Sequence, residues 1–238
     1  MQFAVVNGTR ALPAPRATGT CALCLAPMIA KCGAIKVWHW AHASREHCDP
    51  WWERESDWHR SWKQTFPPHW REAICHDEST GERHIADVRT PTGTVLELQH
   101  ASISTTERRS RESFYRKLVW LVDGRSFRAR FQIHSPPLPP PGSEMATHLA
   151  FNRDGSEFWP RSSALSGYST RYLREKYDWE VGRQYCGHHF FHWKNERPTW
   201  LLASNPVVFD FGNDELASLQ TFQTDGRLCV QQIGRAHV

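Results

Sequence analysis

Residues 84–100 read HIADVRTPTGTVLELQH, and this stretch decides the fold that we expect around it. Its two halves, His84–Thr90 and Thr94–His100, alternate between apolar and polar residues and are joined by a Pro-Thr-Gly turn, which is typical of a β-hairpin. Because successive side chains of a strand point to opposite faces, Asp87 and Glu97 belong to the same side of the hairpin. Side chains directly opposite each other on paired strands lie about 4.5–5.5 Å apart, so the two carboxylates are expected to be neighbours.

Two carboxylates at that distance repel each other, and either a proton or a divalent cation relieves the repulsion. Mg²⁺ favours a site with one or two carboxylates whose remaining positions are left to water and phosphate. The same two residues also suit an exposed, solvated sheet face. The metal site is favoured because apolar residues on the other face fix the register of both strands: Ala86, Val88, Leu96 and Leu98.

A helix and a further strand are expected before the hairpin. Asp49 is a suitable N-cap and Pro50 a suitable first residue for a helix that continues from Trp51 to Phe66, where two prolines stop it. A strand near Trp70–Cys75 follows this helix.

A helix and a buried strand are expected after the hairpin. Ser104 and Glu107 form a capping-box pattern that opens a helix ending near Lys117. The continuous apolar run Leu118–Val122 then predicts a strand buried on both faces. The expected order is therefore helix, strand, strand, strand, helix, strand, and the fold class is α/β (α+β).

Charged side chains recur along both predicted helices. Glu55, His59 and Lys63 are spaced i, i+4 and i+8, so they share one helical face beside the carboxylates, although such a stripe by itself is usually solvated. The second helix carries four arginines: Arg108, Arg109, Arg111 and Arg116. Arginines can contact DNA phosphates, and Arg108 and Arg111 are the candidate DNA-binding residues, but a charge-rich helix is more often a solvated face.

Four residues ahead of the predicted core have the spacing of a structural zinc site: Cys21, Cys24, His39 and His42. Two pairs of soft or borderline ligands are what a tetrahedral Zn²⁺ requires. Three alternatives remain open. Cys48 or His47 can replace one histidine, one of the two histidines can face the carboxylates instead, or the two cysteines can be a reduced, metal-free pair.

Several of these segments together resemble the competence protein CoiA-like family, within the PD-(D/E)xK nuclease superfamily. The resemblance rests on Ile85–Val88, on Glu97–His100 and on the run ESDWHRSWK over residues 55–63. It covers roughly residues 21–124, including the Cys/His segment and the arginine-rich helix. It implies a restriction-endonuclease-like αβββαβ core in which Asp87 and Glu97 hold Mg²⁺ or Mn²⁺.

The resemblance also implies roles for the remaining candidates. Glu55 extends the metal site, while His59 and Lys63 become partners of phosphate or water. Gln99 stands where the superfamily usually has a lysine that assists the attacking water. Glutamine cannot act as a base at neutral pH, which weakens a proton-handling role at this position more than it weakens the nuclease assignment.

The resemblance thus implies a magnesium-dependent DNA nuclease, a metal-dependent hydrolase such as an endonuclease, that serves DNA processing, transformation or recombination. Two other classes of function remain. One is a non-catalytic, zinc-dependent nucleic-acid-binding protein on a nuclease-like fold. The other is a protein-interaction adaptor that uses the proline-rich segment and the aromatic C-terminal half.

Changes in composition suggest four regions. Residues 1–48 hold the Cys/His module, residues 49–134 the nuclease-like core, residues 135–142 a proline-rich linker or ordered edge segment, and residues 143–238 an accessory region of unknown role. The accessory region contains Cys186, His188, His189 and His192, which suit an aromatic core better than a second metal site. Residues 233–238 resemble a translated sequencing adapter, so we expect the natural chain to continue differently beyond about Gln232.

The composition of the chain indicates which kinds of partner and which cellular location to expect. The chain has 29 Lys and Arg against 25 acidic residues, a mildly basic balance that permits DNA as a partner without requiring it. A hydrophobic content of 39% is sufficient for a folded core, which excludes disorder throughout. We see no export signal and no apolar run near the roughly 18 residues of a membrane span, so a cytoplasmic protein without a membrane partner is expected.

Overall fold

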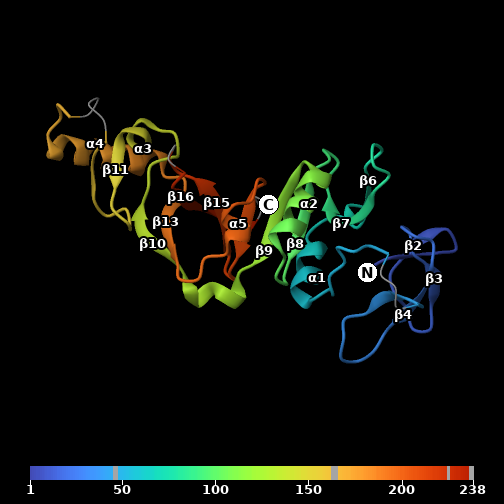
Figure 1. Ribbon diagram of the computed structural model, residues 1–238. Helices are drawn as coiled ribbons and strands as arrows, with labels where there is room; N and C mark the ends of the chain where they lie inside the picture. Colours follow the sequence, from blue (N-terminus) through green and yellow to red (C-terminus); the bar gives the residue numbers. More distant parts are fainter. Residues whose placement is uncertain (45–47, 162–165, 224–225, 236–238) are drawn as a thin grey trace. The chain divides into compact units, whose positions relative to one another are not determined.

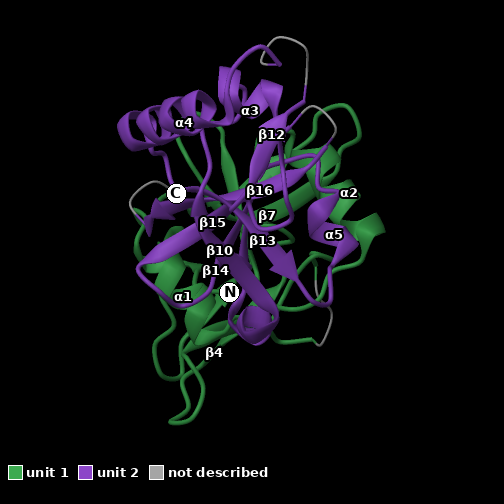
Figure 2. Ribbon diagram, turned by 90° about the vertical axis from the view of Figure 1, so that its left-hand side faces the viewer, with its two compact units in different colours: residues 1–120 green, residues 121–238 purple. Residues whose placement is uncertain are grey.

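The computed structural model describes residues 1–44, 48–161, 166–223 and 226–235 (Figure 1). The chain divides into two compact units, Met1–Trp120 and Leu121–Val238, which Figure 2 colours separately. The division falls inside strand β9 (Leu118–Asp123), whereas the sequence placed the end of the core at residue 134. Both units combine strands with helices, so the fold class is α+β.

The first part of unit 1 is a five-stranded antiparallel sheet in the order β2-β1-β3-β4-β5. Its strands are β1 (Ala4–Val6), β2 (Thr9–Ala11), β3 (Thr18–Thr20), β4 (Pro27–Lys31) and β5 (His39–His42). Its buried core is small: Ala4, Cys21, Leu23, Met28 and Trp40. So few buried side chains contribute little to the stability of this sheet. A small fold of this kind commonly needs a further source of stability, such as a bound metal ion.

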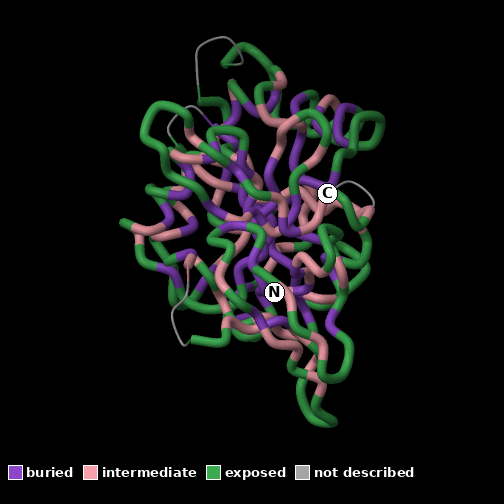
Figure 3. The backbone as a smooth tube through the Cα atoms, turned by 90° about the vertical axis from the view of Figure 1, so that its right-hand side faces the viewer, coloured by how far each residue is buried: buried purple, intermediate pink, exposed green. Residues whose placement is uncertain are grey.

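The second part of unit 1 contains the other predicted elements in the predicted order. They are α1 (Asp57–Gln64), β6 (Arg71–His76), β7 (Arg83–Arg89), β8 (Val95–Gln99) and α2 (Thr105–Tyr115), followed by β9. The strand order is β9-β8-β7-β6. Val88 pairs with Leu96 in the antiparallel β7–β8 hairpin, and the same register sets Asp87 opposite Glu97. Every residue of β8 is buried. Figure 3 shows in purple the buried residues of the chain.

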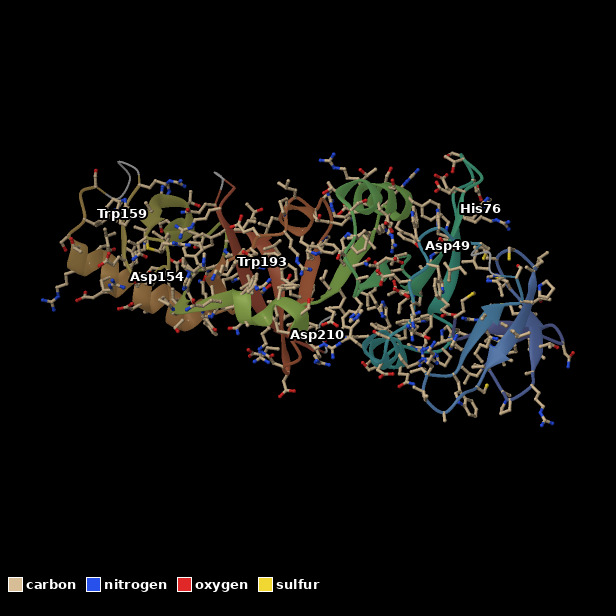
Figure 4. All side chains as sticks on the ribbon, turned by 60° about the horizontal axis from the view of Figure 1, so that its bottom comes forward. Asp49, His76, Asp154, Trp159, Trp193 and Asp210 are labelled. Carbon is tan, nitrogen blue, oxygen red and sulfur yellow. The ribbon has the colours of Figure 1, made fainter. Side chains whose placement is uncertain are left out.

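Helix α1 begins at Asp57, so the prediction of a helix from Trp51 with Asp49 as its N-cap is wrong. The Asp49 carboxylate instead accepts hydrogen bonds from the Ile85 backbone N–H at 2.8 Å and faces His84 Nδ1 at 2.8 Å (Figure 4). The Trp51 ring stacks on the His84 ring with centroids 3.3 Å apart. These contacts fasten residues 48–56, here called the strap, to β7, and the helix starts only after Ser56.

Capping explains where both helices of unit 1 begin. Ser56 and His59 form a reciprocal capping box at α1, which satisfies two backbone donors of the first turn. Ser104 caps α2 as predicted, and its hydroxyl accepts from the Glu107 backbone N–H at 3.0 Å. The side chain of Glu107 turns to Arg111.

Unit 2 contains an antiparallel group of strands in the order β10-β13-β16-β15-β14. They are β10 (Phe131–Pro137), β13 (His188–Trp193), β14 (Val207–Asp210), β15 (Glu215–Thr221) and β16 (Leu228–Gly234). The other elements are η1 (Arg125–Arg130), α3 (Glu144–His148), β11 (Leu149–Phe151), β12 (Phe158–Pro160), α4 (Thr170–Gln184) and α5 (Pro198–Leu201).

The proline-rich segment is part of unit 2 rather than a free linker. Pro137 pairs with His189, and the backbone N–H of the buried Leu138 donates to the His188 carbonyl at 2.8 Å. Strand β10 lies at an edge of its sheet, where a proline does not remove a bond from the ladder. The segment is therefore the ordered edge that the sequence also allowed.

The accessory region has the expected aromatic core, in which Phe190, Trp193 and Trp200 are buried. His188 and His189 are engaged by Gln220 and by the His134 carbonyl, at 3.0 and 2.9 Å. Strand β16 extends to Gly234, and residues 236–238 lie outside the described residues. Among the described helices, none is long and apolar enough to span a membrane.

Candidate active site and metal centre

Four side chains of unit 1 gather as a potential metal site: Cys21, Cys24, His42 and Cys48. Their ligand atoms all lie within 4.8 Å of one another. The two first cysteines are held by a tight turn after β3, in which the Leu25 N–H donates to the Cys21 carbonyl at 2.9 Å. Three thiols and one imidazole form a set that can bind a structural zinc ion.

The fourth ligand differs from the predicted one, because Cys48 takes the place of His39. His39 and His42 are three residues apart on β5, so their side chains point to opposite faces of the strand. His42 Nε2 lies 3.3 Å from Cys24 Sγ, whereas His39 Nδ1 lies 2.8 Å from the Val37 carbonyl oxygen. Cys48 Sγ lies 3.6 Å from Cys21 Sγ. The alternative ligand His47 lies outside the described residues.

The chemistry of the three thiols fits a cation. Burial, together with the neighbouring thiols of Cys21 and Cys24, raises the pKa of Cys48 because thiolates placed side by side repel one another. A bound cation removes that repulsion, since a metal-bound cysteine is a thiolate. The site is thus better suited to a metal ion than to three free thiols.

A cavity of about 580 Å³ lies between the module and the core of unit 1. Its lining comes from β5, the strap, α1, β7 and β8. Asp87 and Glu97 both line it, and Glu97 is only 4% exposed. The pair predicted from the hairpin is therefore enclosed, not spread over an open sheet face.

The two carboxylates are held by backbone donors and by two cations. Asp87 accepts from the Leu98 N–H at 2.9 Å, and Glu97 accepts from the Asp87 N–H at 3.3 Å. Lys63 Nζ lies 2.8 Å from Asp87, and Arg111 lies 2.9 Å from Glu97. Burial and the neighbouring Asp87 raise the pKa of Glu97 to about 7. Burial opposes ionisation of Asp87, but Lys63, His59 and the Leu98 N–H together lower its pKa.

Lys63 is a buried cation surrounded by three carboxylates. Besides Asp87, its ammonium lies 3.4 Å from Glu72 and 3.6 Å from Glu55. Burial disfavours the charge, yet these three carboxylates raise the pKa of Lys63, so it stays protonated. Of these partners, the sequence reasoning missed Glu72.

Glu72 ties the first residues of the chain to this cleft. Its carboxylate accepts from the Gln2 and Phe3 backbone N–H groups at 2.7 and 3.1 Å. Its φ of 46° lies in the left-handed region that glycine favours, and such strain persists only where surrounding contacts fix it. No motif marks this residue, because its role depends on contacts about 70 positions away in the chain.

Glu55 precedes the first turn of α1, so it does not continue the helical stripe as the spacing predicted. It still reaches the cleft and pairs with Arg60 at 2.5 Å. Its second oxygen, Oε1, is buried, makes no hydrogen bond and lies 3.6 Å from Lys63 Nζ. A buried oxygen without a hydrogen bond is costly, so a cation in the cleft would stabilise it.

His59 and Gln99 are engaged in holding β8. His59 Nε2 lies 2.7 Å from the Leu98 carbonyl oxygen, and His59 Nδ1 lies 2.9 Å from the Ser56 hydroxyl. The Gln99 amide donates to the Glu53 carboxylate and, at 3.1 Å, to the Ala101 carbonyl. Glu53 also lies 3.5 Å from His59 and lines the cavity, although the sequence reasoning did not identify it. These contacts make His59 and Gln99 positioning residues.

Arg108 and Arg111 are buried, so their prediction as DNA-contacting residues is not supported by where they lie. Arg108 has no exposed surface and pairs with Glu112, while Arg111 binds Glu97, Glu107 and the Trp51 carbonyl. The spacing i, i+3, i+4, i+7 of the buried face was visible in the sequence: Arg108, Arg111, Glu112 and Tyr115. Arg111 instead orients Glu97.

One comparison with known proteins finds a family model that matches the segment with the Cys/His cluster. Residues 12–50 match the model of the family described as "Competence protein CoiA, N-terminal domain". This match supports the CoiA-like family. No curated protein and no solved structure matches the chain. The CoiA-like segment contains the complete Cys/His cluster and the first residues of the strap.

Proposed function

We propose that unit 1 is a magnesium-dependent nuclease of the PD-(D/E)xK type that hydrolyses DNA phosphodiester bonds. The observation that carries the proposal is the pair of carboxylates, Asp87 and Glu97, which lie opposite each other on β7 and β8 and line one cavity. The match to the N-terminal domain of a competence protein supports a competence-related role, which we propose to be DNA processing, transformation or recombination.

The oxygen donors of the cleft suit Mg²⁺ or Mn²⁺. Asp87, Glu97 and Oε1 of Glu55, which makes no hydrogen bond, would hold the ion, and hard cations of this kind take carboxylate oxygens. When bound, the ion supplies an activated water and stabilises negative charge on the phosphate. Glu97 would give up its proton to become a ligand.

The chain's own residues would prepare this site. Arg111 and the Asp87 backbone N–H fix the orientation of Glu97, and His59 fixes the backbone of β8 next to it. The Lys63 ammonium keeps a positive charge beside Asp87, where it is suited to neutralise a phosphate or to orient water. Gln99 supports the strap through Glu53.

One observation favours a second candidate, a non-catalytic nucleic-acid-binding protein on the same fold. The Lys63 ammonium already stands between three carboxylates and balances part of the charge that a metal ion would neutralise. A cleavage assay decides between the two candidates. It compares the cleavage of plasmid and of single-stranded DNA by the same protein with Mg²⁺ and in EDTA-free buffer without Mg²⁺. Binding without cleavage under every condition would support the second candidate.

Replacing Gln99 with lysine is expected to keep DNA cleavage within about tenfold of the wild-type rate. The Gln99 side chain donates to Glu53 and contributes no base, and a lysine ammonium can replace that donor with an ion pair. Initial cleavage rates in Mg²⁺ would measure this. A loss as large as that of an Asp87 variant would contradict the positioning role of Gln99.

The stability of the zinc-loaded protein without added Mg²⁺ should depend on pH through Glu97. Its folded pKa of about 7 exceeds the ordinary value of 4.5, so the protonated form stabilises the fold. This contribution is fully present below about pH 4.5 and is lost as the pH rises through 7. Relative to Glu97→Gln, the wild type should therefore lose about 1–3 kcal/mol of unfolding free energy between pH 5 and pH 8.

Urea unfolding of both proteins at the two pH values measures the difference. Comparison with the glutamine variant cancels the other titrating groups that both proteins share. If the difference in unfolding free energy between the two proteins is the same at pH 5 and at pH 8, the pKa of Glu97 is not raised by folding.

A further inference from the structure

The size of the cavity limits which form of DNA can reach the carboxylates. A volume of about 580 Å³ is that of a sphere only about 10 Å across. The major groove of B-DNA alone is about 12 Å wide, so a whole duplex is far broader than this cavity. A single unpaired nucleotide is small enough to enter. Asp87 and Glu97 are therefore accessible to a strand that has left its duplex.

Four aromatic residues are among those that line the same cavity. Trp51 and Trp52 come from the strap, and His39 and Trp40 come from β5. Trp52 is 40% exposed, unlike Trp40, which is buried in the core of the module. A partly exposed indole in a cavity of this size offers a stacking surface for a base, and stacking on aromatic rings is how proteins hold single strands.

The charges of the cavity determine the orientation in which a nucleotide would bind. The carboxylates of Asp87 and Glu97 repel a phosphate unless a cation covers them, whereas the Lys63 ammonium beside them attracts it. Lys31 lines the cavity from β4, next to His39, where it can contact the following phosphate of a strand. The base would therefore lie against Trp52, and the phosphate would lie at the carboxylates Asp87 and Glu97.

From this arrangement we infer that the cavity accepts one unpaired nucleotide and that the substrate is single-stranded DNA or an unpaired end. The base stacks on Trp52, and the phosphate lies over Asp87 and Glu97. The inference rests on the proposed function for the reaction, but the binding that it describes does not require cleavage.

Binding can be tested in an Asp87→Asn background, which removes turnover. Fluorescence anisotropy would compare a labelled 20-nucleotide single strand with the blunt duplex of the same sequence. We expect tighter binding of the single strand, and Trp52→Ala should weaken it by about tenfold or more, since one base stack contributes this much. Trp52→Phe keeps an aromatic face and should restore most of the affinity. Trp179→Ala is the matched control, because Trp179 is 58% exposed but belongs to α4 of unit 2.

The outcomes separate this inference from the proposed nuclease. If single strand and duplex bind equally, or if Trp52→Ala and Trp179→Ala change binding by the same factor, the inference is overturned, even when the wild type cuts DNA. If the wild type never cuts DNA but Trp52 controls single-strand binding, the inference stands and the nuclease proposal fails. Should Trp52→Ala not fold, the comparison of Trp52→Leu with Trp52→Phe decides in its place, because the leucine lacks the stacking face.

Discussion

Replacing Asp87 with asparagine is expected to lower magnesium-dependent DNA cleavage by at least about a thousandfold while the protein stays folded. The amide has nearly the same size as the carboxylate, but it lacks the charge that a metal ligand requires. The site offers few substitutes, because its other carboxylates already face cations: Glu97 pairs with Arg111, and Glu55 and Glu72 lie beside Lys63. Initial rates on a labelled single strand in Mg²⁺ would measure the loss.

The effect of Asp87→Asn on stability should be small, since two opposing changes accompany it. Lys63 loses its nearest ion pair, at 2.8 Å, but retains Glu72 and Glu55. At the same time Glu97 loses the like charge that helps to raise its pKa. Thermal melting would report the balance, and Asp178→Asn on the exposed surface of α4 is the matched control. A folded Asp87→Asn protein that cuts DNA at the wild-type rate would overturn the proposed site.

Removing the zinc ligands should have the largest effect on folding. The purified protein is expected to contain about one zinc ion, and the double variant Cys21→Ser, Cys24→Ser should lose it together with several kcal/mol of stability. The reason is that the buried core of the module is small and its turn carries two of the four ligands. Elemental analysis and urea unfolding would measure both quantities, with Cys186→Ser, an exposed cysteine of unit 2, as the control.

A matched pair of histidine variants tests the ligand set itself. His42→Ala should release zinc, whereas His39→Ala should retain it, because only His42 belongs to the cluster. Zinc that is lost from both variants, or a well-folded wild type without zinc, would refute this assignment.

Zinc loss should also lower cleavage without changing its dependence on Mg²⁺. Cys48 begins the strap, which continues through Asp49 and Trp51 to Glu53 and Glu55 at the cleft. Releasing Cys48 therefore loosens one end of the segment that carries three carboxylates of the cavity, Asp49, Glu53 and Glu55. Four protein ligands leave no open position on the zinc ion, so it would act on the cleft through structure alone.

The sequence by itself determined the elements whose signals are local. The alternation in residues 84–100 and the turn between its halves specify the hairpin, and its register sets Asp87 opposite Glu97. Ser104 specifies the start of α2, and the spacing of Cys21 and Cys24 specifies half of the metal cluster. Each of these depends on neighbours within a few residues, so the pattern is complete in the sequence.

Only the tertiary structure decided the features that depend on distant partners. Asp49 has a high propensity to cap a helix, but its carboxylate instead binds β7 and fastens the strap there. Helix α1 therefore begins only at Asp57. Cys48 rather than His39 completes the potential metal cluster, because strand alternation turns His39 to the face of β5 opposite His42. The sequence predicts Arg111 as a DNA-contacting residue, but in the structure it is buried and pairs with Glu97. In each case a contact between segments far apart in sequence outweighs the local preference, because burial makes an unpaired charge or donor more costly than a lost cap or a shorter helix.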